Sequence, residues 1–448
     1  MTLTKLHPLF FFTLLLPSFF SLQAQDSTTV RQMIATLSSS EMHGRSIAYD
    51  GEYKAAEYIR SIFRETKAEP LGNDYFQSYN FPGFAMEGNV SLSINGMELN
   101  PFDDYRIYPF SMSLDKQDIP VISADPIILI NKEKREKFIK KNSEKFKNSF
   151  IYFDISMLDE MKDKYQADQI RLAIYFLSIS RKNQYFDVLG YLIGDTKLPV
   201  IGLSGTTHER PYAYIQVIAK KMKKAKTLSV SYNNRFVAHK ANNVVAKIEG
   251  VRQPDSMIVF TAHYDHIGCM GKDVIFHGAH DNASGTATVL SLAQYYSKNP
   301  SDYTMVFCLF SGEEGGLRGS NHFADEPLIE LEKVKMLLNL DMMCGGSEGI
   351  MVVNSREGIP SFYYDKLVKI NNEKQYLPAV KSRPNTSNSD HFPFTEKGVN
   401  ALFIYTMGGP SGGYHEYTDT EENCGLSQWE NIFHLIIDWV DVMTSSNK

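Results

Sequence analysis

Three apolar runs in the second half of the chain each end in side chains that can bind a metal ion. His263 and Asp265 follow the first run, Glu313 and Glu314 follow the second, and Asp341 closes the third. An apolar strand has no packing reason to end three times in an acid or an imidazole, so the joint pattern indicates a metal site. Zinc takes both imidazole nitrogen and carboxylate oxygen as ligands, so these residue types fit zinc.

Two loops add further candidate ligands. Asp281 lies in the stretch GAHDNASG, and Tyr414 and His415 lie in the stretch YHEYTDT near the end of the chain. Each stretch alone is weak evidence, because a single His at a strand end is more often structural and an adjacent Glu pair is more often surface charge. The prediction of a metal site therefore rests on the whole set.

The elements that must position these side chains are buried strands that alternate with helices from Asn243 onward. We predict strands at Met257–Ala262, Met305–Phe310, Met336–Leu340, Ile350–Val353 and Ala401–Tyr405. Helices are predicted at about 284–296 and 427–443, and further helices between Thr28 and Phe63 break at Gly51. This alternation is typical of an α/β sheet covered on both faces, where ligands gather at the carboxyl ends of the strands.

Six stretches in chain order resemble the di-zinc aminopeptidase family, which also contains glutaminyl cyclases and glutamate carboxypeptidase. They are AHYDHIG, GAHDNASG, FSGEEGGLRGS, NLDM, SDHFPF and YHEYTDT. The resemblance covers about residue 243 to the C-terminus, and the start of the chain near Gly44 and GEYKAAEYI is also similar. It implies a three-layer α/β sandwich with a mixed, mostly parallel central sheet, and a zinc-dependent aminopeptidase with two zinc ions per chain.

The resemblance also implies how the ligands divide between the two metals. His263 and Asp341 would bind one zinc ion, Glu314 and His415 would bind the other, and Asp281 would bridge the two. A bridging carboxylate allows two cations to lie about 4 Å apart, and five protein ligands leave room for water and substrate.

Three further residues receive catalytic roles from the same resemblance. Glu313 would act as general base and then general acid, and Asp265 would hold the second ring nitrogen of His263. Tyr414 would donate to the oxyanion. The alternatives are a loop-capping role for Asp265 and a buried packing role for Tyr414.

The remaining histidines near these motifs are interpreted differently. His266, His277 and His280 are extra loop histidines that we interpret as bystanders. His391, in the stretch SDHFPF, is expected to be a structural residue near the site rather than a ligand.

Composition excludes several other classes of protein. The 448 residues include 46 Lys and Arg and 52 Asp and Glu, for a net charge of −6, with 43% hydrophobic residues. This is a globular composition that argues against a disordered or nucleic-acid-coating chain. Between about residues 105 and 239 the chain becomes locally basic, and we predict an inserted subdomain there, of the protease-associated type by position alone. Its charge runs are expected to be solvated helix faces.

The main domain would then combine residues 25–104 with residues 240–448. Residues 1–24 resemble a secretory signal peptide that is cleaved after Ala24, which predicts a secreted or periplasmic protein. No later segment is apolar enough to span a membrane. Cys269, Cys308, Cys344 and Cys424 allow three disulfide connectivities, and the sequence selects none, although Cys308 lies in an apolar run as a buried free thiol would.

Two rival functions remain open at this point. A glutaminyl cyclase uses nearly the same ligands at a single zinc ion, but Ser389 before Asp390 is more similar to the peptidase pattern. A catalytically inactive binding module would be expected to lack a ligand or the general base, whereas this chain has the complete set. The expected partners are peptides with a free N-terminus, while the side-chain preference and oligomeric state are left open.

Overall fold

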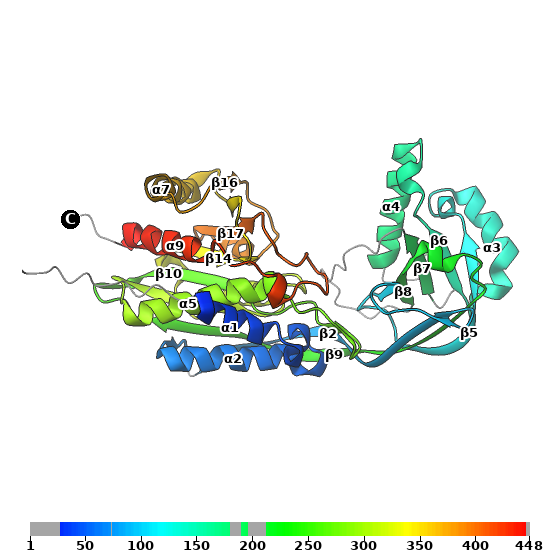
Figure 1. Cartoon of the computed structure of the whole chain (residues 1–448), viewed down its shortest axis with the longest axis horizontal. Coiled ribbons are helices and arrows are strands. Elements are labelled where there is room, and N and C mark those ends of the chain that lie inside the picture. Colours follow the sequence, from blue (N-terminus) through cyan, green and yellow to red (C-terminus); the bar gives the residue numbers. More distant parts are fainter. Residues whose placement is uncertain (1–26, 73, 180–189, 196–211, 445–448) are drawn as a thin grey trace, which may run out of the picture.

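The computed structural model describes residues 27–72, 74–179, 190–195 and 212–444, which form two units joined by a pair of long strands (Figure 1). These strands, β2 (Phe76–Ile94) and β9 (Thr227–Ile248), pair antiparallel, with a register shift between Glu87 and Ser91. We call the described part of residues 88–232 the inserted unit and the rest the main unit. The predicted signal peptide lies outside the described residues.

A mixed sheet forms the centre of the main unit, with the strand order β16-β15-β17-β14-β10-β13-β9. Its further strands are β10 (Gln253–His263), β13 (Tyr303–Phe310), β14 (Val334–Leu340), β15 (Gly349–Val353), β16 (Val380–Arg383) and β17 (Ala401–Met407). β10 pairs parallel with β13 and β14, β14 with β17, and β15 with β16, whereas β13 pairs antiparallel with β9 and β15 with β17. The five strands predicted from sequence are all present, and the prediction of a mixed, mostly parallel sheet is confirmed.

Alternate residues of each strand point to opposite sides of the sheet, so both faces carry apolar side chains and both are covered by helices. On β10, Ile258 and Phe260 belong to the core on one face, and Val259 belongs to the core on the other. The first face is covered by α1 (Ser27–Leu37), α2 (Gly51–Thr66), α5 (Ser284–Lys298), α7 (Gly358–Lys374) and α9 (Trp429–Thr444). The second is covered by α6 (Arg318–Asp325) and α8 (His391–Glu396). The predicted helices correspond to α1, α2, α5 and α9.

The inserted unit is a small α/β unit that continues the sheet beyond β9. The strand order runs β9-β5-β6-β7-β8-β4, and β5 to β8 are parallel neighbours. Its elements are β3 (Met97–Glu98), β4 (Tyr105–Ile107), β5 (Leu114–Ala124), α3 (Lys132–Phe146), β6 (Phe150–Asp154), α4 (Lys164–Ile179), β7 (Gly190–Asp195) and β8 (Ala213–Ile218). The apolar run at residues 198–203 also predicts a short strand, but it lies outside the described residues. The chain enters the inserted unit along β2 and leaves it along β9, without a loop at either border. The domain limits at residues 105 and 239 therefore stay a prediction.

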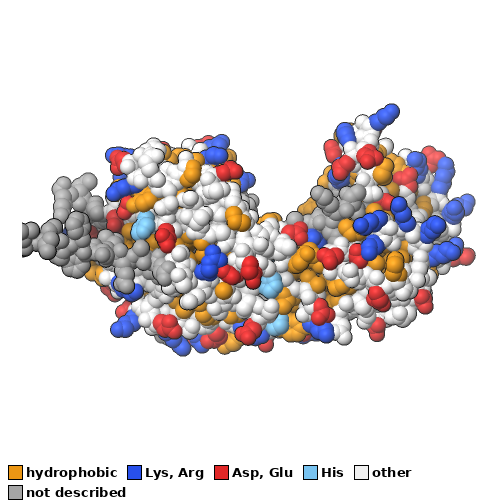
Figure 2. Space-filling view, in the orientation of Figure 1, with side chains coloured by type: hydrophobic (Ala, Val, Ile, Leu, Met, Phe, Trp, Pro, Cys, Tyr) orange, Lys and Arg blue, Asp and Glu red, His pale blue; other side chains and the backbone are white. Residues whose placement is uncertain are grey.

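The basic helix of the inserted unit, α3, exposes nearly all of its side chains. On α3 only Phe146 is buried, and Lys137 pairs with Glu133 one turn away at 2.6 Å. Figure 2 shows Lys and Arg spread over this unit and a hollow between the two units. The basic run is therefore a solvated helix face. Within the described ranges, no helix combines the length and the apolar character needed to cross a membrane.

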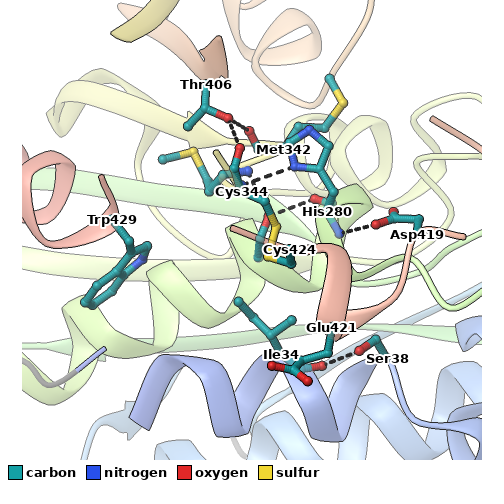
Figure 3. The surroundings of a disulfide bond; sticks show 12 residues. Ile34, Ser38, His280, Met342, Cys344, Thr406, Asp419, Glu421, Cys424 and Trp429 are labelled. Atoms are coloured by element: carbon teal, nitrogen blue, oxygen red, sulfur yellow. Dashed lines mark hydrogen bonds between the residues drawn. A yellow bond between two sulfur atoms is a disulfide. The ribbon is translucent and has the colours of Figure 1, made fainter. Parts of the chain in front are cut away.

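One disulfide joins two segments of the main unit that are far apart in sequence. Cys344, after β14, is bonded to Cys424, before α9, with a sequence separation of 80 (Figure 3). Cys269 and Cys308 are free thiols, and Cys308 is buried within β13, as expected. Burial raises the pKa of the Cys308 thiol, so it stays protonated.

Replacing Cys424 with Ser should lower the free energy of unfolding by about 2–4 kcal/mol, because the unfolded chain regains the entropy of a long open loop. Urea unfolding of the oxidised wild type and Cys424→Ser measures this difference. Cys269→Ser, which removes a thiol that forms no disulfide, serves as the control. Identical unfolding midpoints for the wild type and Cys424→Ser would contradict the expectation.

Candidate metal centre

The carboxyl ends of three neighbouring parallel strands bring the predicted ligands together. His263 is the last residue of β10, Asp341 directly follows β14, and Glu313 and Glu314 lie shortly after β13. Because β10 lies between β13 and β14, these side chains meet at one edge of the sheet.

The loop that contains Asp281 is held in place by a second acid from late in the chain. The carboxylate of Asp419 accepts hydrogen bonds from the backbone N–H of His280 at 2.7 Å and of Asp281 at 3.0 Å. Figure 3 shows Asp419 facing the backbone of His280. The amide of Asn282 also donates to the carbonyl of Leu340 at 3.1 Å, which ties this loop to the end of β14.

Asp281 lies between two pairs of candidate ligands. Its Oδ1 is 3.3 Å from Nε2 of His263, and its Oδ2 is 3.2 Å from Nε2 of His415. Nε2 of His263 is also 3.3 Å from Oδ1 of Asp341, and Nε2 of His415 is 3.0 Å from Oε1 of Glu314. The two oxygens of one carboxylate therefore face two different His-carboxylate pairs.

His266, which we interpreted as a bystander, lies inside the cluster and is a further candidate ligand. Its Nδ1 is 3.0 Å from Oε1 of Glu314 and 3.9 Å from Oδ2 of Asp281. Ligand atoms of His266, Asp281, Glu314 and His415 lie within 4.8 Å of one another, as do those of His263, Glu313 and Asp341. The available signal was its position three residues after His263, at the same strand end.

The two other loop histidines make contacts away from the ligand groups. Nδ1 of His277 faces the carbonyl of Ser38 at 2.7 Å, and Nδ1 of His280 accepts a hydrogen bond from the backbone N–H of Cys344 at 3.1 Å. His391 is buried, with Nε2 3.2 Å from Oδ1 of Asn385. All three therefore have structural contacts.

The charges and the orphaned polar atoms of the cluster fit metal ions. Burial alone would lower the pKa of His415, but Glu314 and Asp281 raise it to about 11, so the carboxylates create a strong demand for positive charge. Oδ2 of Asp281 and Nε2 of His266 are buried without a hydrogen-bond partner. Buried charges are normally paired or coordinate metals, and this nitrogen and oxygen donor set suits zinc.

Asp265 fixes the backbone of the tandem glutamates. Its Oδ1 accepts a hydrogen bond from the N–H of Glu313 at 3.1 Å, and its Oδ2 accepts one from the N–H of Glu314 at 3.2 Å. The same carboxylate lies 3.6 Å from Nδ1 of His263, which is closer to the backbone carbonyl of Asp265, at 3.2 Å. Asp265 thus caps the glutamate turn and also lies beside the imidazole.

Glu313 and Tyr414 line the same site. Burial, followed by the negative charge of Glu314, raises the pKa of Glu313, which suits a group that must take up and release a proton. The ring of Tyr414 stacks on His415 with 3.8 Å between centroids. Tyr414 is 53% exposed, so it is not the buried packing residue considered as an alternative.

A buried chain of hydrogen bonds orients Asp341. The hydroxyl of Ser389 donates to Oδ2 of Asp341 at 2.7 Å, and the amide of Asn339 donates to the Ser389 hydroxyl at 2.7 Å. Thr261 in turn donates to Oδ1 of Asn339 at 2.7 Å. Because Thr261, Asn339 and Ser389 are fully buried, the second oxygen of Asp341 is held in one direction.

A largely apolar cavity of about 120 Å³ adjoins the cluster. It reaches Glu314 and His266 of the cluster, and both units contribute its walls. The apolar lining includes Ile47, Phe81, Phe84 and Phe276 from the main unit and Ile107 and Phe110 from the inserted unit. Space for apolar groups therefore exists next to candidate metal ligands.

The second half of the chain is similar in sequence to a known family. Residues 243–440 match the model described as peptidase family M28. Aminopeptidase YwaD of Bacillus subtilis is 32% identical over 176 residues, which cover 38% of this chain and 37% of that protein. A vacuolar membrane protease of Kluyveromyces lactis is 27% identical over 195 residues, covering 43% of this chain and 20% of that protein. The matches span well under half of each relative.

Solved structures share the fold over nearly the whole chain. An aminopeptidase from Aneurinibacillus is 17% identical with a TM-score of 0.61, covering 95% of both chains. A zinc aminopeptidase from Bacillus subtilis is 20% identical with a TM-score of 0.66, covering 94% of this chain and 96% of that one. At such identities the likeness shows the fold alone. Residues 243–440, which match the model of peptidase family M28, contain all the candidate ligands.

Proposed function

We propose that this protein is an exported aminopeptidase that uses two zinc ions to remove residues from the free N-terminus of peptides. The observation that carries the proposal is the Asp281 carboxylate, whose two oxygens face His263 with Asp341 and His415 with Glu314. Two zinc ions held by these residues would polarise the scissile carbonyl and generate hydroxide near neutral pH. Export rests on the signal peptide predicted at residues 1–24, and a disulfide is compatible with it.

Glu313 is the proton carrier in this proposal. Its partner in the tandem pair, Glu314, faces His415 and His266 and is engaged as a ligand. Glu313 takes a proton from the attacking water and then delivers it to the leaving amine. Asp265 keeps both glutamates in place through their backbone N–H groups.

Tyr414 and the acidic cluster bind the substrate. The half-exposed phenol of Tyr414, stacked on His415, supports a role as donor to the carbonyl oxygen of the scissile bond. Asp281, Glu314 and Asp341 supply negative charge where the α-amine of the substrate must lie. A blocked amine loses its charge and its lone pair, so free N-termini are preferred.

The apolar cavity supports a preference for peptides with apolar side chains. It touches Glu314, so a substrate bound at the metals has apolar walls within reach. Burying one large apolar side chain is worth about 1.5–3 kcal/mol, which would separate leucyl or phenylalanyl peptides from glycyl peptides by one to two orders of magnitude in affinity.

Exhaustive chelation should abolish peptide hydrolysis, and added zinc should restore it. Elemental analysis of the purified protein should give about two zinc ions per chain. The circular dichroism of the zinc-free chain should show that it stays folded, because the apolar cores on both sheet faces do not depend on the metals. Less than one zinc ion per chain would favour the inactive binding module instead.

Glu313→Gln should retain the metals but lose at least ~100-fold in kcat, the usual contribution of a positioned acid-base group. Glu314→Gln should instead lose zinc, since its carboxylate faces both His266 and His415. Zinc content and kcat measured on both variants separate the two roles. The reverse pattern would show that the two glutamates exchange roles.

Free dipeptides and tripeptides should be trimmed from the N-terminus one residue at a time, whereas N-acetylated versions should lose on the order of 100-fold or more in kcat/KM. Mass spectrometry of the products identifies the bond that is cleaved. Equal cleavage of free and acetylated peptides would contradict an aminopeptidase. A product lighter by ammonia from an N-terminal Gln peptide would identify a glutaminyl cyclase.

A further inference from the structure

The candidate ligand His415 lies in a loop without regular secondary structure, which we call the ligand loop (residues 408–420). The backbone φ of His415 is 55°, in the left-handed region that residues other than glycine rarely adopt. No strand or helix holds the imidazole of His415, so its position depends on contacts that the loop makes with other parts of the chain.

The main unit holds the end of this loop. Asp419 accepts two backbone hydrogen bonds from the segment that contains Asp281, and Cys424, a few residues further on, is tied to Cys344 by the disulfide. Arg31 of α1 also pairs with Glu421. These contacts all follow His415 by four residues or more. They reach the residue next to His415 only indirectly, through the backbone N–H of Asp419, which donates to the carbonyl of Glu416 at 3.1 Å.

The inserted unit contacts the two residues that directly follow His415. Nη2 of Arg106 donates to Oε2 of Glu416 at 2.8 Å. The guanidinium of Arg106 stacks over the ring of Phe102 at 3.9 Å, and the edge of Phe102 meets Tyr417 with 4.5 Å between centroids. An ion pair and an aromatic contact thus join the two units beside the candidate ligand.

Arg106 is a rigid anchor because of its place in the inserted unit. It lies on β4 between Tyr105 and Ile107, which are both buried in the core of that unit. The Arg106 side chain is only 5% exposed, against 27% for Glu416. A buried guanidinium has lost most of its hydration, so the carboxylate of Glu416 is strongly favoured to stay beside it.

The same part of the inserted unit also contacts the loop that leads to Asp281. Phe102 packs against Phe276 with 5.4 Å between centroids, and the N–H of Ile107 points to Sδ of Met270 at 3.3 Å. The inserted unit thus contacts both the ligand loop and the segment that leads to Asp281.

We propose that the inserted unit is a positioning element of the metal centre, with Arg106 and Phe102 holding Glu416 and Tyr417 so that the imidazole of His415 faces the second metal position. The proposal rests on the proposed function, because it takes His415 as a zinc ligand. Neither Arg106 nor Phe102 reaches the metals; both act through the ligand loop. Residues that orient metal ligands typically change metal affinity by 10- to 100-fold when they are lost.

The inserted unit offers a matched control for this ion pair. Nζ of Lys221 lies 3.1 Å from Oδ2 of Asp104, at almost the same separation as the Arg106–Glu416 pair. Both of its members belong to the inserted unit. Lys221→Met therefore removes an ion pair from the same unit without touching the ligand loop.

The test measures zinc affinity of the full chain by competition with a chromophoric chelator, for the wild type, Arg106→Met, Glu416→Gln and Lys221→Met. We expect Arg106→Met and Glu416→Gln to weaken binding of one of the two zinc ions at least ~10-fold, with Lys221→Met within about twofold of the wild type. The double variant Arg106→Met/Glu416→Gln should be no weaker than the single variants, because both remove the same contact. If Arg106→Met does not fold, Glu416→Gln still tests the same ion pair from its other member.

Wild-type zinc affinity in both Arg106→Met and Glu416→Gln would overturn the proposal while leaving the proposed function intact. Equal weakening in Lys221→Met would also overturn it, because the effect would then reflect the stability of the inserted unit rather than the contact. A wild-type chain that binds no zinc at all would overturn the proposed function first, and this proposal with it.

Discussion

Negative charge concentrated at one edge of a buried sheet is the constraint on which this structure depends. Asp281 and Glu314 are buried in one ligand group, and the buried Asp341 lies with Glu313 in the other. Carboxylates at such distances repel each other, and the imidazoles of the cluster supply only part of the compensating charge. Bound cations would supply the rest of that charge, so the strands, the Asp281 loop and the ligand loop together build a candidate cation site.

Much of this could be predicted from the sequence because the relevant signals are local. Buried strands appear as short apolar runs, and a His, Glu or Asp directly after such a run, as at His263 and Asp341, marks a strand end. The Glu313–Glu314 pair indicates a metal site only in combination with two other apolar runs, which also end in metal-binding side chains. The parallel order of β13, β10 and β14 then brings these ends together.

What could not be predicted depends on contacts between distant loops. His266 lies in the cluster because the chain turns directly after β10, and no periodic pattern encodes that turn. The pairing of Cys344 with Cys424 requires the end of β14 and the start of α9 to meet in space. The Arg106–Glu416 ion pair joins residues 310 positions apart, and each looks like an ordinary charged residue in the sequence.

The long antiparallel pair of β2 and β9 has a consequence for how such a chain could change over evolutionary time. The chain leaves the main unit on one strand and returns on its antiparallel neighbour, so the backbone of the inserted unit is connected to the main unit only through this strand pair. Shortening that strand pair at its far end would leave the hydrogen bonds between β9 and β13 untouched. The main unit is thus modular in its backbone. A shortened chain would nevertheless need another contact to hold the residues that follow His415. Substitutions at these positions would therefore record the loss of the inserted unit.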